Sequence, residues 1–319
     1  MKIGDDDMAN ETLEQIVQAD ALVAPKLSPF GKADSVLEQT LRDFIQLQST
    51  TIAIGTQLVG VRTVGWLSFT WYTGSEGTFK YPLDDNAVVD PTMIGTSNYS
   101  VKLEKGQGRC VFLDSTLLRG ESWENMNRQQ MAIIQARADL IDNHILTKLV
   151  AGAGQAQAAG ALWSAGGADP EADILNAMDL IFKNARVSGN ERLALVLPAE
   201  LRADMMNTRL YTNVLMSLQE RLNSMVSLDV YYTRDYGASG AIPAGGAGTV
   251  GAILMVAGSE TGEFFTYNGD GFQETELTRI EGVGFSWLLT SYMGTVIHET
   301  QDGAGAGETN RICTITGCL

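Results

Sequence analysis

SWENMNRQQMAIIQARADLIDNHILTKLV, residues 122–150, is the strongest single secondary-structure signal in this 319-residue chain. It contains no Pro or Gly, and Ser122 can cap the first turn of a helix. At about 1.5 Å per residue, a helix over 123–150 is a rod of about 42 Å, more than twice the usual length of a globular helix. Its apolar residues recur at helical spacing in one stripe: Ile134, Ala138, Ile141, Ile145 and Leu149. Its solvent-exposed faces are expected to carry the charged residues Arg128, Arg137, Asp139, Asp142 and Lys148.

The apolar stripe of this helix needs a partner surface. In the C-terminal part of the chain, Phe285, Trp287, Leu289 and Val296 alternate with polar residues, as expected of a strand with one buried face. We therefore expect Ile141 to be buried against this returning segment.

Before the long helix, the residue preferences become those of strands. Residues 59–71 are rich in Val, Thr, Phe and Trp, and residues 99–104 alternate and lead into a second extended run at 109–113. The roughly 25 residues between them are polar and rich in turn formers, and loops of that length are usually functional or disordered. The pattern predicts a projecting flap of two strands.

The first fifty residues indicate an arm with a helix rather than a domain. Leu37, Leu41, Phe44 and Ile45 have helical spacing within 34–48, and two prolines in 24–29 interrupt any longer element. This segment has too few apolar residues to fold alone, so it must lie on another surface, for which a neighbouring subunit is one candidate.

After the long helix, a linker of small residues is expected to reach residue 167, followed by a compact α/β unit. Asp169 and Pro170 are typical of a helix start, and Ser188-Gly189 of its end. The apolar face expected for this helix is Ile174, Met178, Ile181 and Phe182. Strands are then predicted at 193–197, 228–232 and 250–256, helices at 198–207 and 215–224, a loop at 233–248, and a β-rich segment at 263–316 with turns at 268–271 and 302–307.

Composition excludes several classes of protein. With 45% apolar residues the chain can bury a sizeable core, so it is not a disordered chain. Its 22 basic and 38 acidic residues give a net charge of −16, which argues against a protein that wraps nucleic acid. The acidic N-terminus lacks the pattern of a signal peptide, and no apolar run approaches the length of a membrane span, so we expect a soluble chain made in a cytoplasm.

No catalytic template fits the chain. Residues 246–251 have the spacing of a dinucleotide-binding glycine motif, but a strand follows them where that motif needs a helix. His144 is expected to be a satisfied helix residue, and His298 has no Cys or second His at metal spacing. We therefore predict no catalytic, cofactor-binding or metal-ligating residue, and no enzyme.

Cysteines and aromatic residues leave alternatives open. Cys110, Cys313 and Cys318 are too few for a disulfide-framed secreted domain, and a disulfide between Cys313 and Cys318, or to Cys110, would require oxidising exposure. The aromatic residues near the flap could form a stacking surface, but their strand spacing favours a place in the core or in an interface; they are Trp66, Trp71, Tyr72 and Phe79.

In their order, the arm, flap, very long helix, α/β unit and returning β segment resemble the major capsid proteins of tailed bacteriophages and related viruses with the HK97-type fold. Residues 101–104 through 114–118, then 122–150 and 151–154, are similar to the run from the extended loop to the spine helix. Leu193-Ala-Leu-Val-Leu-Pro-Ala-Glu-Leu-Arg202 is similar to the strand and helix of the axial domain. The resemblance implies an α+β fold with an N-terminal arm at 1–50, an extended loop and flanking strands at 51–113, a spine helix and linker at 114–168, an axial domain at 169–262, and a returning β segment at 263–319.

The resemblance also implies a function. The chain would assemble into pentamers and hexamers of an icosahedral shell that encloses double-stranded DNA without sequence-specific binding, in a virion assembled in the host cytoplasm. Its partners would be copies of itself, a scaffolding protein, a portal and cement proteins, with no cofactor and no membrane. The alternative is an encapsulin, a nanocompartment shell of the same fold that encloses a protein cargo. Lys80 is the flap lysine nearest the turn, but no matching asparagine is identified, so no isopeptide cross-link is predicted.

Overall fold

The structure is a computed structural model. It describes residues 53–74, 96–113, 122–165, 168–185, 187, 191–206, 208–211, 214–225, 228–234, 250–267, 274–280, 284–298 and 309–318. The predicted arm, the tip of the flap, the loop at 233–248 beyond Arg234 and the turns at 268–271 and 302–307 lie outside the described residues.

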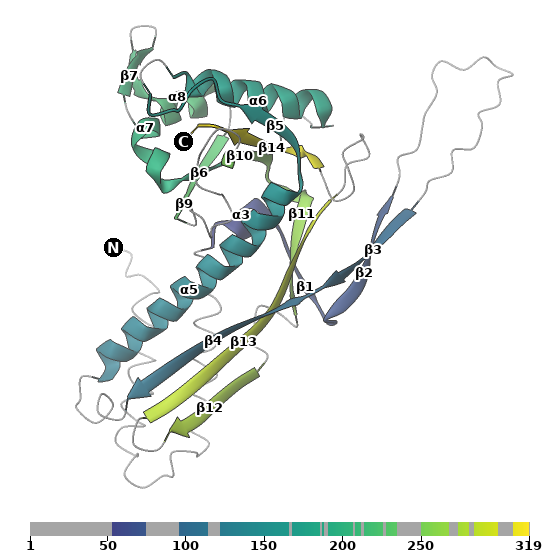
Figure 1. Ribbon diagram of the computed structural model, residues 1–319, viewed down its shortest axis with the longest axis vertical. Helices are drawn as coiled ribbons and strands as arrows, with labels where there is room; N and C mark the ends of the chain where they lie inside the picture. Colours follow the sequence, from purple (N-terminus) through teal and green to yellow (C-terminus); the bar gives the residue numbers. More distant parts are fainter. Residues whose placement is uncertain are drawn as a thin grey trace, which may run out of the picture.

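The helices of the described chain lie around two sheets (Figure 1). They are α3 (Gly55–Leu58), α5 (Ser122–Ala151), α6 (Pro170–Asn184), α7 (Arg202–Met206) and α8 (Leu218–Met225), with a 3₁₀ turn at Ala199–Leu201. The strands are β1 (Val59–Val64), β2 (Ser68–Gly74), β3 (Thr96–Lys102), β4 (Glu104–Leu113), β5 (Ala153–Ala158), β6 (Leu193–Pro198), β7 (Thr208–Tyr211), β8 (Val214–Ser217), β9 (Leu228–Thr233), β10 (Val250–Val256), β11 (Gly258–Tyr267), β12 (Glu274–Ile280), β13 (Gly284–Ile297) and β14 (Thr309–Thr316).

Two five-stranded sheets make up most of the described chain. The long sheet has the order β1-β11-β13-β12, and β4 also pairs with β13. The central sheet has the order β5-β14-β10-β6-β9. Separate from both, β2 and β3 form an antiparallel ladder from Ser68 opposite Lys102 to Gly74 opposite Thr96. This ladder confirms the two-stranded flap, but β1 does not belong to it, because β1 pairs in parallel with β11 in the long sheet.

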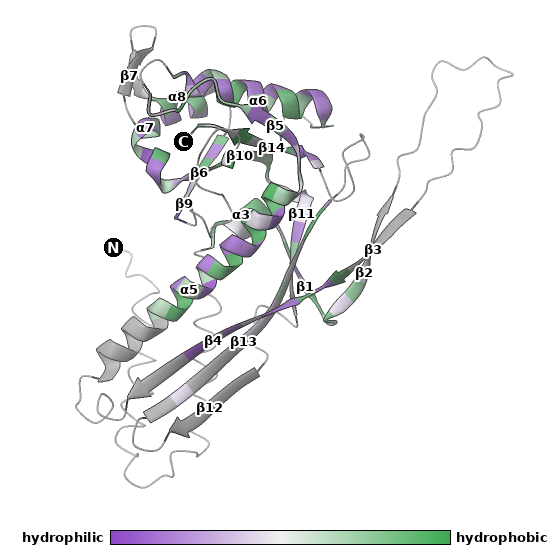
Figure 2. Ribbon diagram, viewed as in Figure 1, coloured by the Kyte–Doolittle hydropathy of each residue, from purple (hydrophilic) through white to green (hydrophobic). Residues whose placement is uncertain are grey.

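The helix at 122–150 is confirmed as α5, and all five residues of the predicted stripe are buried. It lies alongside β4 and β13 of the long sheet (Figure 1), with hydrophobic and hydrophilic bands alternating along its described part (Figure 2). Ile141 packs in one cluster with Met293 and Ile297 of β13, as expected. Val296, which was predicted to lie on the face that meets Ile141, instead points to the opposite face of β13 and packs with Phe265.

Two charged residues that were predicted to lie on the solvent-exposed faces of α5 are buried. Asp139 and Lys148 are exposed as expected, whereas Arg137 and Asp142 are each only 7% exposed. Arg137 is one residue from Ala138 and one turn from Ile141, so it borders the stripe and is covered with it. The side chains of Arg128, Phe285, Trp287 and Leu289 lie outside the described residues.

Strands β6 and β10 of the central sheet are buried on both faces, which explains their continuous apolar sequences. Alternate residues of β6 pack on opposite sides: Leu195 joins a cluster with α6, and Val196 joins the cluster with α5. The strands predicted at 193–197, 228–232 and 250–256 are confirmed as β6, β9 and β10, and the two that were predicted to be buried, β6 and β10, are buried.

The structure differs from the sequence prediction after α5, at the end of α6 and at the start of α8. The predicted linker after α5 contains β5, which pairs in parallel with β14. Helix α6 is capped by Asp169 as predicted but ends at Asn184, before Ser188, and Phe182 on it is 42% exposed rather than buried. The helix predicted at 215–224 begins only at Leu218, because Ser217 and Glu220 form reciprocal hydrogen bonds that cap α8 at that point.

Candidate functional site

The described chain begins docked on the middle of α5. The Asp142 carboxylate accepts hydrogen bonds from the backbone N–H groups of Ile54, at 3.1 Å, and Gly55, at 2.6 Å. A β-carbon at Gly55 would lie 2.8 Å from Ile145 Cδ1 and 3.0 Å from Ile145 Cβ, so a larger residue there would force these neighbours to shift. Asp142 therefore holds the start of the described chain on α5.

The flap is anchored at its base by a small apolar cluster. Val101, Leu103, Phe265 and Val296 are buried there, and the ring of Phe69 meets the ring of Phe265 edge to face with centroids 4.9 Å apart. The Leu103 backbone N–H also donates to the Leu67 carbonyl at 2.9 Å. The hairpin is therefore rooted on the long sheet, and it projects away from the body (Figure 1).

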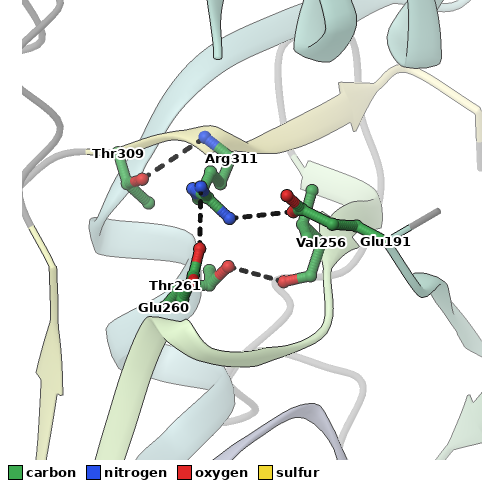
Figure 3. A network of polar contacts seen from close by, with 6 residues as sticks. All are labelled: Glu191, Val256, Glu260, Thr261, Thr309 and Arg311. Atoms are coloured by element: carbon green, nitrogen blue, oxygen red, sulfur yellow. Dashed lines mark hydrogen bonds and ion pairs between the residues drawn. The ribbon is translucent and has the colours of Figure 1, made fainter. Parts of the chain in front are cut away.

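A network of charged and polar groups joins the two sheets (Figure 3). The Arg311 guanidinium on β14 contacts the Glu191 carboxylate at 2.9 Å and the Glu260 carboxylate at 3.0 Å. The Thr261 hydroxyl on β11 donates to the carbonyl of Val256, the last residue of β10, at 2.6 Å. Only Ala257 separates these two strands in the chain. Because Arg311 is in the central sheet and Glu260 in the long sheet, this network links the two at their junction.

Beside this junction lies a polar hollow of about 370 Å³. Its lining consists of Glu191, Arg192, residues 256–261 and Arg311. Arg192 is paired with Asp229, and Arg311 with two carboxylates, so both cations already have anionic partners. We therefore interpret the hollow as part of the structural junction between the two sheets rather than as a ligand-binding site.

The two histidines are half-buried, and the pKa of each is lowered. Burial lowers the pKa of His144 below its usual 6.5, although the Glu104 carboxylate, 3.8 Å from Nδ1, acts in the opposite direction. Burial likewise lowers the pKa of His298, against the effects of Glu263 and Glu260 and with that of Arg311. His144 Nε2 is buried without a hydrogen-bond partner, so a proton there would be costly. The helix position expected for His144 is confirmed, but the expectation of a satisfied side chain is not, because Nε2 has no hydrogen-bond partner among the described residues.

These pKa shifts predict how stability depends on pH. Because the folded-state pKa of both histidines lies below the unfolded value, the unfolded chain binds more protons, and stability falls as pH drops through about 6.5. We expect the urea midpoint to decrease between pH 7 and pH 5. A His144→Gln/His298→Gln variant should show a flatter profile over this window, and an unchanged slope would contradict the assignment.

The cysteines of β14 and the C-terminal turn are free, buried thiols. Burial raises the pKa of Cys313 to about 11 and that of Cys318 to about 12, so neither is a reactive thiolate at neutral pH. The disulfide considered between them is not formed, and the side chain of Cys110 lies outside the described residues.

Other candidates from the sequence are placed as follows. Gly251 lies on strand β10, the strand expected after the glycine motif, while residues 246–249 are not described. No cluster of His, Cys, Asp and Glu among the described residues could hold a metal ion, and no described helix is long and apolar enough to span a membrane. Trp66 is 75% exposed, which excludes the core for this residue and leaves both the stacking surface and the interface open; the side chains of Trp71, Tyr72 and Phe79 are not described.

Sequence reasoning missed two buried carboxylates. One is Asp142; the other is Asp173, which accepts from the Trp163 indole at 2.9 Å and from the Gly160 N–H at 3.2 Å. The Ser217–Glu220 spacing could have been recognised as a capping box. By contrast, Asp142 and Asp173 bind partners that local periodicity does not identify.

Comparisons by sequence find no relative. No protein-family model matches the chain, and no curated protein matches it.

Solved structures do match, at low sequence identity. A virus-like particle from Pyrococcus furiosus shares 12% identity with a TM-score of 0.53, over 86% of this chain and 97% of that chain. The capsid of the native GTA particle shares 11% identity with a TM-score of 0.53, over 85% and 90%. The capsid of cyanophage P-SCSP1u shares 10% identity with a TM-score of 0.51, over 83% and 88%. The chain therefore has the HK97-type capsid fold that the order of its sequence elements predicted.

Proposed function

We propose that the chain is a major capsid protein of a tailed bacteriophage or related virus, which assembles into the pentamers and hexamers of an icosahedral shell around double-stranded DNA. The observation that carries this proposal is the similarity in fold to capsid and virus-like-particle subunits over more than four-fifths of the chain. The hairpin β2–β3 supports it, because it forms a separate two-stranded sheet whose base packs on the long sheet.

In this proposal the regions have distinct roles. Residues 1–50 are the arm, 51–113 the extended loop with its flanking strands, 114–168 the spine helix and linker, 169–262 the axial domain, and 263–319 the returning β segment. The arm and extended loop would contact neighbouring subunits. The role is structural rather than enzymatic, in a virion assembled in the host cytoplasm, with a scaffolding protein, a portal and cement proteins as further partners.

The net charge of −16 fits a container for DNA. An acidic lining repels phosphate and keeps a packed genome from adhering to the wall. The function is tested by isolating particles from the native source with antibodies to this chain. Closed shells with nuclease-protected DNA are expected. Shells filled with a protein cargo would contradict the viral role and favour an encapsulin, and free monomers would contradict both.

The extended loop gives a prediction of its own. Lys80 is the only Lys or Arg between residues 75 and 95, so trypsin can cut this segment at one place. If the loop lies on neighbours, cleavage at Lys80 should be fast in free subunits and at least about tenfold slower in shells. Mass spectrometry of the fragments measures both rates, and a Lys80→Gln variant identifies the band. Equal rates in the two states would contradict the loop's role.

A further inference from the structure

The middle of α5 packs on the first residues of β4. A β-carbon at Gly106 would lie 3.0 Å from Leu140 Cδ2. Two residues earlier on the strand and one turn later on the helix, the Glu104 carboxylate lies 3.8 Å from Nδ1 of His144. Because alternate residues of a strand share one face, these two contacts form one seam between the helix and the long sheet. The seam thus consists of Leu140 and His144 on α5 and of Glu104 and Gly106 on β4.

The two ring nitrogens of His144 have different surroundings. Nδ1 is the nitrogen near Glu104, whose side chain is 68% exposed, whereas Nε2 is buried and has no hydrogen-bond partner. The His144 side chain as a whole is only 13% exposed. A protonated ring carries an N–H at both nitrogens, so Glu104 can pair with the one at Nδ1, but the one at Nε2 has no acceptor in the seam. The charged ring therefore has a partner only on its outer side.

The other charged groups around the ring do not favour its charged form. Lys148, one turn later on α5, acts against a positive charge on His144, and Arg137, two turns earlier, is a further cation on the same side of the helix. Asp142 lies on the other side of α5, where its carboxylate accepts from backbone N–H groups. On β4, Lys105 lies over an aromatic ring on the opposite face of the strand. Strand β13 and helix α3, which also pack on α5, contain no charged residue.

We propose that this seam is an acid-sensitive switch: when His144 takes up a proton, its ring moves out of the seam toward Glu104, and the middle of α5 separates from the start of β4. The movement brings the N–H at Nε2 from a site without an acceptor into water. Because the neutral ring fits the closed seam and the charged ring fits the open one, lower pH shifts the population toward the open state. The switch lies within one subunit, so it does not rest on the proposed function. It is local to His144, whereas the pH dependence of unfolding reports both histidines together.

Hydrogen exchange of the folded chain at pH 7.5 and pH 5.5, read by mass spectrometry, tests the switch. After correction for the intrinsic effect of pH, peptides from 137–148 and 104–109 should exchange about three- to tenfold faster at pH 5.5. About tenfold is the maximum for one histidine whose pKa in the open state is about 6.5. The peptide that contains β6, which is buried throughout, should remain protected at both pH values. Equal exchange of the seam peptides at the two pH values, or a simultaneous loss of protection in β6, would overturn the proposal.

Variants assign the effect to one residue. The chain has only two histidines, so His298→Gln should keep the pH effect on the seam peptides and His144→Gln should abolish it. Persistence of the effect in His144→Gln would overturn the proposal.

Titration of the histidine rings gives a second readout that does not require His144→Gln to fold. In the histidine-labelled chain, nuclear magnetic resonance follows two titration curves, and His298→Gln assigns them. Glu104→Gln should move the midpoint of His144 to lower pH, because the charged ring loses its partner. An unshifted midpoint would contradict the pairing of Glu104 with the protonated ring, and the switch with it.

Discussion

Replacing Ile141 with aspartate should unfold the subunit or leave it barely stable, and abolish shells. Ile141 is 1% exposed and packs in the cluster that joins α5, Met293 and Ile297 to the central sheet. An ionised carboxylate there replaces apolar contacts with the cluster, and burial of such a group costs several kcal/mol, about the size of a domain's total stability. Soluble yield and urea unfolding followed by circular dichroism measure the effect.

The matched control introduces the same residue on the exposed face of the same helix. Gln135 is exposed on α5, so Gln135→Asp should cost only about 0.5 kcal/mol, the difference in helix propensity. Arg137→Ala, which the sequence suggests as a surface control, is unsuitable because Arg137 is buried. Normal particles from Ile141→Asp would show that the buried stripe is misassigned, and the spine helix with it.

Removing the carboxylate of Asp142 should have the next largest effect. Asp142→Ala leaves the N–H groups of Ile54 and Gly55 without their acceptor at a largely buried site. Each unsatisfied buried donor costs about 1–3 kcal/mol, so we expect a loss of about 2–4 kcal/mol in the free energy of unfolding. Urea unfolding measures this loss, and faster proteolysis around residue 53 should accompany it.

Two variants sharpen this second prediction. Asp139→Ala, on the exposed side of α5, should change stability by less than about 0.5 kcal/mol. Asp142→Asn keeps one carbonyl acceptor but loses the charge, so its stability should fall between those of wild type and Asp142→Ala. If Asp142→Ala is as stable as Asp139→Ala, the anchoring of the chain start on α5 is wrong.

Strong periodicity explains why much of the fold could be predicted. The stripe of α5 has helical spacing over four turns, and β6 and β10 are short continuous apolar runs, which a sheet buried on both faces requires. The failures have equally physical reasons. Strand β5 contains only Ala, Gly and Gln, residues with little strand preference, and its partner β14 lies about 150 residues later in the chain.

Isolated side chains were harder to place than elements. Phe182 continues the four-residue spacing of Ile174 and Met178, but it lies at the border of the apolar face and remains exposed. Asp142 looks like a surface charge until the backbone at 54–55 is known to lie against it. The joint at Arg311 combines residues from distant parts of the sequence, so no local spacing reveals it.

Electron cryomicroscopy of particles assembled from this chain tests the proposed capsid role. We expect closed icosahedral shells of pentamers and hexamers, in which each subunit shows α5 beside the long sheet and the β2–β3 flap in contact with a neighbouring subunit. A chain that remains monomeric at high concentration with its scaffold present, or shells in which the flap contacts only its own subunit, would contradict it.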